Sequence, residues 1–551
     1  SGKDNPICNI LAMKGITYDQ LHMDFQSSPE EGLNGKSSVY GMHTDSLMLD
    51  TLYLNVTHGL EGLDFQTGVI SKARKGQEAF DIDLDGFIHN GSAQVMLQYL
   101  NAKKERGVYM GLNAELRRRG IRMKLIPETP TLVYRPFTLN KQNFIYLADR
   151  GRLFGNISLY DEQGTGFYAN RQDSLANQDM TVELSRINLK EFKRIMPYLP
   201  EMEGWLGGEA HYVDTNGEVS ISGDFRMEDF NYEGNALGDW EVSGVYLPET
   251  GNEHYVDGFI RHNGEEIAYV NGAYTSSEKE GDNLEADMSL TDFPLYVINP
   301  FVPDKFVEFS GKSSGMLSME GNPARPTLNG EVKMDSVILA LPDLSVKFRM
   351  DEKPVQMVDS KLSFNDFHIY TAGKSPFTIN GTVNMANLER ITTDLRMKAT
   401  DYELMNAKKT RRAVTYGKIY VDVDATLRGA IDELKMRGNM NVLGKTDFTY
   451  ILKDSPLAVS DRLGDMVTFV NFNDTVPVAE VEKQPVSLNG MDIAMTVHID
   501  QAVQVHVDLT PDASNYMLVE GGGDLSFQYT PQGDMLLNGR YSLMSGELKY
   551  E

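Results

Sequence analysis

One short pattern recurs over most of the chain and constrains its fold more than any other feature. It reads apolar-x-Gly-x-apolar-x-apolar, and its copies begin at Leu153, Ile221, Leu328, Ile379, Met436 and Leu537. Side chains alternate between the two faces of a strand, so the glycine and its apolar partners share one face. A chain that repeats the same one-sided strand is predicted to build an extended apolar surface rather than a compact globule.

The length and charge of the chain narrow its class. A single hydrophobic core stops growing near roughly 250–300 residues, and this chain has 551. It carries 52 Lys and Arg against 79 Asp and Glu, a net charge of −27, which disfavours nucleic acid or an anionic membrane surface as a partner. Cys8 is the single cysteine, so no internal disulfide can form.

No apolar run reaches the ~18–20 residues of a membrane helix. No signal peptide is visible, and we expect a fragment of a longer protein.

The clearest strand is predicted over 418–429. Its odd-numbered positions, such as Val421 and Val423, are apolar, and its even-numbered positions are mostly polar. This period of two is typical of an antiparallel strand with one buried face. If Asp422 faces only solvent, the substitution Asp422→Ala should be nearly silent. The pattern therefore predicts a mainly β protein, a long curled antiparallel sheet with a few short helices.

A longer repeat of about one hundred residues divides the chain. Segments 184–208 and 290–315 each hold a short helical pattern, near 189–196 and 293–299, followed by prolines and a Gly-x-x-x-Gly spacing. The segment 452–489 breaks the rhythm and is interpreted as an insertion with a short helix over 461–469. We predict three regions: 1–183, 184–315 and 316–551.

Motifs for chemistry are weak. Asp81, Asp83 and Asp85 resemble the start of an EF-hand calcium loop, but the twelfth position is Ser92 instead of glutamate, and the flanking residues alternate like a strand. No phosphate-binding loop or nucleophile elbow is present. We predict no enzyme activity, no catalytic residues, no metal and no cofactor.

The apolar face is then the main candidate site. One interpretation is an ordinary sandwich core, as in a passive surface adhesin, with one sheet buried against another. We favour a groove, because glycine repeatedly occupies the apolar face, where a core would prefer volume. The side chains predicted to line this groove are Ile157, Leu159, Ile221, Phe225, Met227, Leu328, Val332, Met334, Ile379, Val383, Met385, Ile419, Val421, Val423, Leu427, Met440 and Val442.

Three neighbouring segments resemble a known family. Residues 416–429, 434–442 and 447–451 look like the signature stretch of TamB, the large subunit of the bacterial translocation and assembly module, within the AsmA-like group of bridge-type lipid transfer proteins. The two helix-containing segments also resemble internal repeats of that family. The resemblance is strongest over about 360–551.

The resemblance implies a function. It implies a periplasmic protein that is anchored in the inner membrane in its parent form and docks on a BamA-type outer-membrane barrel. It also implies a taco-like sheet whose apolar inside carries phospholipid. The alternative function is that of an assembly chaperone or scaffold for outer-membrane barrel proteins, which would pair their strands with an open sheet edge.

Overall fold

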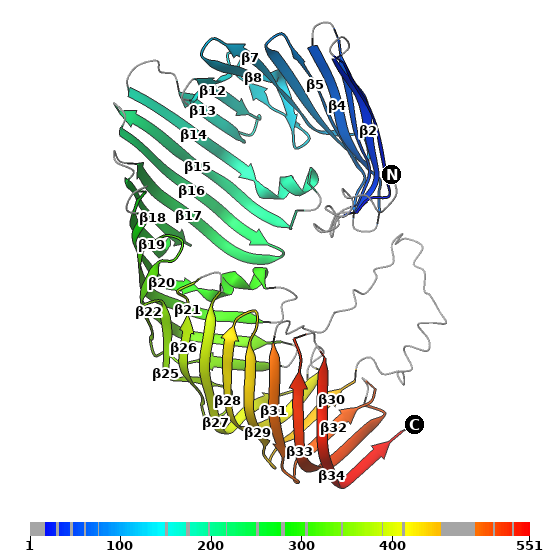
Figure 1. The fold of residues 1–551 in the computed structure, drawn as a ribbon, viewed down its shortest axis with the longest axis vertical. Coiled ribbons are helices and arrows are strands. Elements are labelled where there is room, and N and C mark those ends of the chain that lie inside the picture. Colours follow the sequence, from blue (N-terminus) through cyan, green and yellow to red (C-terminus); the bar gives the residue numbers. More distant parts are fainter. Residues whose placement is uncertain are drawn as a thin grey trace. The chain divides into compact units, whose positions relative to one another are not determined.

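The fold is almost entirely β. The computed structural model describes all residues except 1–16, 29–31, 44–47, 60–61, 75–76, 149–152, 172–176, 197–198, 216–217, 249–252, 277–280, 303–306, 343–344, 388–389, 410–413, 453–490, 511–512, 532–533 and 551. Of the described residues, 76% lie in strands and 3% in helices. This confirms the predicted mainly β class, a long antiparallel sheet with a few short helices (Figure 1).

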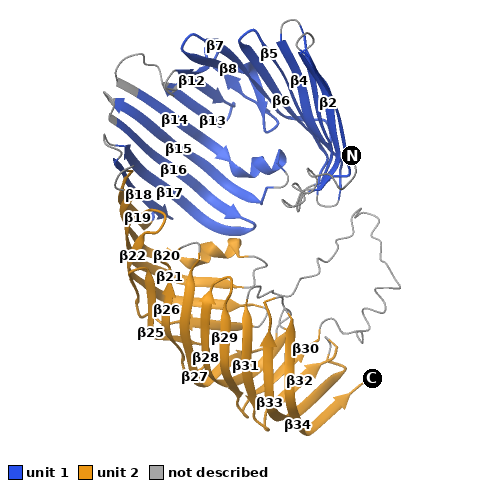
Figure 2. Cartoon of the chain, viewed as in Figure 1, with its two compact units in different colours: residues 1–265 blue, residues 266–551 orange. Residues whose placement is uncertain are grey.

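The chain forms two compact units, residues 1–265 and 266–551 (Figure 2). The division falls inside the predicted region 184–315. The predicted insertion 452–489, except its first residue, and the predicted helix 461–469 lie outside the described residues. Within the described part of the chain, no helix is both long and apolar enough to span a membrane.

In its described residues, unit 1 is a meander of antiparallel strands with one short helix, η2. Its elements are β1 (Gln20–Ser28), β2 (Gly32–His43), β3 (Met48–His58), β4 (Gly62–Ser71), β5 (Phe80–His89), β6 (Ser92–Asn101), β7 (Arg106–Arg117), β8 (Gly120–Leu132), β9 (Arg135–Pro136), β10 (Thr138–Leu139), β11 (Phe144–Ala148), β12 (Leu153–Tyr160), β13 (Gly166–Arg171), β14 (Asn177–Asn188), η2 (Leu189–Arg194), β15 (Met202–Thr215), β16 (Glu218–Tyr232), β17 (Asn235–Pro248) and β18 (Glu253–His262). Most strands pair with the next one in sequence. The exceptions surround the short β9 and β10, where β8 pairs with β11 and β10 with β12.

Unit 2 continues in the same style, beginning with a strand whose first residue belongs to unit 1. Its elements are β19 (Glu265–Thr275), β20 (Asn283–Pro294), η3 (Leu295–Phe301), β21 (Glu308–Gly321), β22 (Thr327–Leu341), β23 (Val346–Met350), β24 (Val355–Val358), β25 (Lys361–Tyr370), β26 (Phe377–Asn384), β27 (Thr392–Ala407), β28 (Thr415–Ala430), β29 (Lys435–Val442), β30 (Asp447–Ile451), β31 (Asp492–Ile499), β32 (Gln504–Asp508), β33 (Tyr516–Tyr529) and β34 (Met535–Lys549). All six copies of the glycine pattern lie in or at the ends of strands: β12, β16, β22, β26, β29 and β34.

Unit 2 departs from the antiparallel pattern at one step. Strand β28 pairs with both β29 and β30, and these pair in parallel with β31 and β32. A parallel step cannot be closed by a hairpin, because the chain must return to the end of the sheet where the previous strand began. It needs a crossover connection of a dozen residues or more. Strand β30 ends at Ile451 and β31 begins at Asp492, so the chain between them is long enough for such a connection.

Four strands contain the same β-bulge, which the sequence analysis missed. In each, an aspartate with a positive φ of about 50° stands between two positions where the register shifts: Asp229, Asp292, Asp366 and Asp401. The local sequence is apolar-x-Asp-aromatic in all four. Aspartate tolerates the left-handed conformation better than most residues, which explains its place there.

The bulge changes which way side chains point. Residues three apart in a regular strand face opposite sides of a sheet, but the extra residue of a bulge brings them to one side. Ala399 and Tyr402, three apart, both belong to one buried cluster. The rings of Phe364 and Phe367 are likewise in contact, with centroids 5.5 Å apart. The bulge therefore adds an aromatic side chain to the apolar face.

A polar side chain from the next strand satisfies each bulge. At the bulge, the backbone N–H of the aspartate has no carbonyl of the neighbouring strand to bond to. A side-chain oxygen from that strand accepts a hydrogen bond from this N–H instead. These bonds are Asp229 N–H to Asp239 (2.8 Å), Asp292 N–H to Ser314 (2.9 Å), Asp366 N–H to Asn380 (2.8 Å) and Asp401 N–H to Asp422 (2.7 Å). Some polar positions opposite the apolar face are therefore structural.

The two helix-containing repeats are structurally equivalent. Leu184 lies opposite Gly208 in the β14–β15 pair, and Leu290 lies opposite Gly315 in the β20–β21 pair. A register shift and a short 3-10 helix follow each leucine, which confirms the predicted helical turns near 189 and 293. One detail differs from the prediction, since η3 does not stop at its proline but contains Pro300.

The bulge predicts a stability difference between two variants of Asp401. Asp401→Val should lower the free energy of unfolding by about 1–2 kcal/mol more than Asp401→Gly, because a β-branched residue is strained at positive φ. Both variants lose the ion pair of Asp401 with Lys445, so their difference isolates the backbone term. Thermal unfolding of both proteins measures it. Equal midpoints would show that the left-handed conformation at Asp401 is not required.

Candidate apolar face

The strands of unit 2 align their apolar residues in rows that run across the sheet. In both the antiparallel and the parallel strand pairs, apolar residues lie opposite apolar residues or a glycine of the neighbouring strand. These residues form rows across the sheet, and each of the two rows below contains one glycine. One row crosses seven strands and consists of Ile379, Met397, Ala425, Gly438, Met495, Phe527 and Leu537. Its neighbour consists of Phe377, Ala399, Val423, Met440, Val497, Leu525 and Gly539. We call these rows, together with the apolar rows parallel to them, the unit 2 apolar face.

The other face of the same strands is polar. A row between the two apolar rows consists of Thr378, Lys398, Asp424, Asn439, Thr496, Ser526 and Asn538. Ion pairs tie neighbouring strands together there: Arg396 with Asp424 (3.0 Å), Arg428 with Asp394 (2.8 Å) and Arg437 with Asp492 (2.5 Å). The sheet is therefore one-sided, as the alternation in the sequence predicts.

The centre of the unit 2 apolar face is filled by its own side chains. Val421 is 1% exposed and Val423 is 6% exposed, and both pack in a cluster with Tyr402 and Met495. Burial raises the pKa of Tyr402 to about 12, because the phenolate would be poorly solvated there. Around β28 the face therefore has the packing of a core.

One glycine on this face has a clear steric reason. A Cβ atom on Gly438 would lie 2.5 Å from the Cα of Ala425 and 2.6 Å from its Cβ, in the neighbouring strand. Such distances are well below van der Waals contact. The small pair Gly438 and Ala425 thus lets larger side chains pack on either side.

Unit 1 has an apolar face of different character on β15–β18. Its middle row has almost no side chains and consists of Ala210, Gly223, Gly244 and Gly258. The row on one side consists of Gly208, Phe225, Val242 and Ile260, and the row on the other of Tyr212, Ile221, Tyr246 and Val256. This face thus has a row of glycines and one alanine between two rows of mostly apolar residues. We call it the glycine channel.

The glycine channel is open. Ile221 is 37% exposed, Val242 is 50% exposed and Val256 is 42% exposed. Large apolar side chains on one continuous face are usually covered in a monomeric protein, so this exposed face is a candidate interaction site. The difference from the buried Val421 of unit 2 is large.

The predicted lining residues fall into three groups by burial. The buried ones are Ile157, Leu159, Leu328, Val421 and Val423, and the exposed one is Ile221. The rest are partly buried: Phe225, Met227, Val332, Met334, Ile379, Val383, Met385, Ile419, Leu427, Met440 and Val442. The structure brings Ile157 and Leu159 together in a cluster of unit 1. It gathers five residues in the cluster around β28: Ile419, Val421, Val423, Met440 and Val442.

Several residues of the two faces were missed by the sequence reasoning. Val242 and Val256 continue the rows of the glycine channel, although their strands lack the full glycine pattern. Gly244 and Gly258 could have been found by a weaker signal, a glycine flanked at two residues by apolar side chains.

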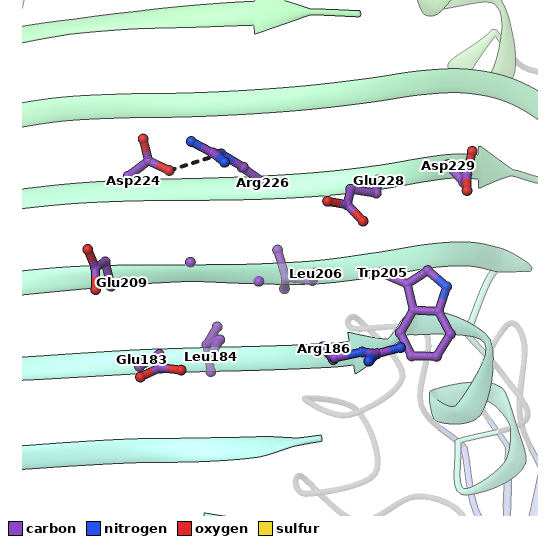
Figure 3. A pocket seen from close by; sticks show the side chains of 12 residues that line it. Glu183, Leu184, Arg186, Trp205, Leu206, Glu209, Asp224, Arg226, Glu228 and Asp229 are labelled. Atoms are coloured by element: carbon purple, nitrogen blue, oxygen red, sulfur yellow. Dashed lines mark ion pairs between the residues drawn. The ribbon is translucent and has the colours of Figure 1, made fainter. Parts of the chain in front are cut away.

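A polar hollow of about 830 Å³ lies over the ends of β14, β15 and β16. Figure 3 shows charged side chains along all three strands, including Asp224 paired with Arg226 at 3.4 Å. The Arg186 guanidinium lies 5.6 Å from the ring of Trp205, a cation–π contact. This hollow is too polar for an alkyl chain.

The EF-hand-like residues lie in a strand. Asp81, Asp83 and Asp85 alternate along β5, where Tyr53 donates a hydrogen bond to Asp83 and Lys104 pairs with Asp81. Burial and the nearby carboxylates raise the pKa of Tyr53 to about 12. Within the described ranges, no group of three or more His, Cys, Asp or Glu side chains is placed to hold a metal ion.

The one-sided packing of β28 predicts opposite outcomes for neighbouring substitutions. Val421→Asp with Val423→Asp should unfold unit 2 locally, because each buried carboxylate without a partner costs several kcal/mol. Asp424→Asn, on the polar face, removes only an exposed ion pair and should cost less than about 1 kcal/mol. Circular dichroism melting compares them. Equal losses of stability would contradict the assignment of faces.

The hydrogen bond at the Asp401 bulge revises the expectation for Asp422. Asp422→Ala leaves the Asp401 N–H without its acceptor and should cost about 1 kcal/mol instead of being silent. Asp422→Asn keeps an acceptor oxygen and serves as the matched control. A melting temperature of Asp422→Ala equal to that of Asp422→Asn would show that the bond does not stabilise the bulge.

Comparison with known proteins gave one match. The family model described as TamB C-terminal domain matches residues 365–550, which include β26–β34 and the whole cluster around β28. No curated protein and no solved structure matched the chain. The match confirms the resemblance that residues 416–451 show. Residues 365–550 are therefore identified as a region similar to the TamB C-terminal domain.

Proposed function

We propose that this chain carries phospholipid across the periplasm toward the outer membrane, along the apolar face of its sheet and without catalysing a reaction. The observation that carries the proposal is the glycine channel. Its floor is formed by Gly223, Gly244 and Gly258, and the apolar side chains that flank it stay open to solvent.

The direction of the channel suits a path. The rows run across successive strands, in the direction in which strands stack at about 4.8 Å each. An alkyl chain lying along the middle row would have apolar side chains on both sides, and at Gly223 it would contact the ring of Phe225, whose Cε2 lies 3.2 Å from the Cβ position of that glycine. The floor leaves room for it, because glycine has no Cβ.

The physics of alkyl burial favours movement. Removing apolar surface from water contributes about 25 cal/mol per Å² and depends little on direction. A chain with no polar partner in the channel can therefore shift from row to row without breaking a specific bond. Methionines such as Met227, Met334 and Met440, whose side chains are flexible, would adapt to irregular ligands.

The family match supports this kind of function. Residues 365–550 match the C-terminal domain of TamB, a family involved in outer-membrane assembly and lipid transport, and this match supports the proposal. By the same reasoning we infer a periplasmic location, an inner-membrane anchor in the parent protein and a BamA-type barrel as partner. These inferences rest on the family alone.

Photo-crosslinking in living cells tests the proposal. A photoreactive amino acid at Ile221, Val242 or Val332 should capture phospholipid, because these side chains lie on the apolar face. The same probe at Glu331, one residue from Val332 and exposed on the polar face, should capture none. Mass spectrometry of the purified adducts identifies the captured molecule.

The control separates side-chain direction from nearness to a membrane, because Val332 and Glu331 occupy the same place along the chain. Equal lipid capture at both would overturn the proposal. Capture of unfolded barrel protein without lipid at Ile221 and Val242 would favour the assembly chaperone instead.

A further inference from the structure

The segment of helix η2 contacts strands of unit 1 that are distant from it in sequence. It connects β14 to β15, yet Ile195, directly after it, packs against the cluster of Leu49, Phe80 and Tyr99 from β3, β5 and β6. The Tyr134 hydroxyl donates a hydrogen bond to the Arg194 carbonyl (3.0 Å), and the Arg194 guanidinium lies 4.7 Å from the Tyr134 ring. In Figure 1 this short helix lies at the ends of β14 and β15.

An apolar cavity lies beneath the end of this segment. It has a volume of about 240 Å³ and is lined by Phe80, Ile82, Leu97, Tyr99, Val108, Ile195 and Met196. A cavity of about 150 Å³ lined by aliphatic and aromatic side chains accepts a benzene ring. The cavity under η2 is therefore large enough for a segment of one alkyl chain. Its lining carries no charge.

A polar pocket lies beside η2 itself. It has a volume of about 750 Å³ and is lined by four cations and three carboxylates, among other residues: Arg74, Lys190, Lys193, Arg194, Glu78, Glu191 and Glu201. A gathering of four cations is notable in a chain with a net charge of −27. Phosphate groups are recognised by such clusters.

The cations differ in how firmly they are held. Arg74 binds both oxygens of Asp50, at 2.6 and 2.8 Å, and holds the pKa of that carboxyl down to about 2. Lys193 stands 3.9 Å from Glu201, with its side chain 44% exposed. Lys190 pairs with Glu203, and Arg194 pairs with Glu191 at 2.6 Å. Lys193 has the longest ion-pair distance of the four and is thus the cation best able to turn toward a ligand.

The cavity and the pocket are neighbours on one face of the β5–β6 pair. Phe80 lies opposite Asn101 and Ile82 lies opposite Tyr99, so these two cross-strand pairs follow one another along the strands. Asn101 lines the polar pocket, whereas the other three line the cavity. Arg194 and Ile195, consecutive in sequence, divide in the same way. Polar and apolar compartments therefore meet at Phe80 and Arg194.

We propose that this paired site binds an amphiphile with a phosphate headgroup, the phosphate beside Lys190, Lys193 and Arg194 and the end of one alkyl chain in the cavity. The proposal rests on the proposed function and specifies it. In this proposal, the pocket beside η2 binds the phosphate headgroup of the lipid. The glycine channel, in contrast, would contact only its alkyl chains.

The test uses dodecyl phosphate that carries a diazirine at the far end of its chain. Irradiation with the purified chain, followed by peptide mass spectrometry, should place crosslinks on the peptides that contain Phe80, Leu97 and Val108. A probe with the same dodecyl chain and diazirine but a trimethylammonium headgroup should crosslink to these peptides about tenfold less. This factor corresponds to the loss of one charge-assisted hydrogen bond of roughly 1.5 kcal/mol.

Two variants locate the two compartments. Lys190→Gln with Lys193→Gln should abolish the preference for phosphate over trimethylammonium, whereas Lys333→Gln, an exposed lysine of β22, should preserve it. Val108→Trp should fill the cavity and remove the mapped crosslinks. Because Val108→Trp could disturb folding, its circular dichroism spectrum is compared with that of the parent chain, and the lysine variant, at exposed side chains, keeps the test decisive.

Three outcomes would overturn the proposal. They are equal crosslinking by both headgroups, crosslinks outside the cavity peptides, and full competition by inorganic phosphate at the concentration of dodecyl phosphate, which would indicate a site for free phosphate. If photo-crosslinkers at Ile221 and Val242 still captured phospholipid in that case, the proposed function would stand without a headgroup-binding site beside η2.

Discussion

Cross-strand register is the constraint on which the rest of this structure depends. Each strand alternates apolar and polar residues, but a one-sided sheet exists only if neighbouring strands align these residues in phase. A slip of one residue between β28 and β29 would place Val423 beside Asn439 or Asn441 instead of Met440. The same phase persists where β31 pairs in parallel with β29, and Gly438 lies beside Met495 there. Direction of pairing is therefore secondary to register.

The aspartate bulges of β16, β20, β25 and β27 affect which side chains lie on the apolar face. An extra residue in a strand switches the side chains that follow it to the opposite face of the sheet. In these bulges, the switch places an aromatic side chain on the apolar face. The aspartate at positive φ and the side-chain acceptor on the next strand form one device, seen at Asp401 with Asp422. Because the acceptor comes from the polar face, the polar face helps to hold the apolar one in place.

Glycine serves two different purposes on the apolar faces. In unit 2, Gly438 allows close packing against Ala425 and helps to fill the centre of the face. In unit 1, Gly223, Gly244 and Gly258 lie in one row without side chains, beside the exposed Ile221, Val242 and Val256. The same strand pattern thus yields a packed face in one unit and an open channel in the other, depending on whether the neighbouring strands place large side chains or further glycines beside it.

The sequence by itself determined the fold class, the one-sided strands and the short helices near 189 and 293, because periodicity and proline are local signals. It also carried the family resemblance. Only the tertiary structure decided which apolar residues are buried, since burial depends on residues from other strands: Leu328 is buried and Ile221 is exposed, although each is the first apolar residue of a copy of the glycine pattern. The η2 site was equally invisible, because it joins Ile195 to Phe80 and Tyr99 over about one hundred residues of chain. Long-range contact of this kind leaves no periodic trace in a single sequence.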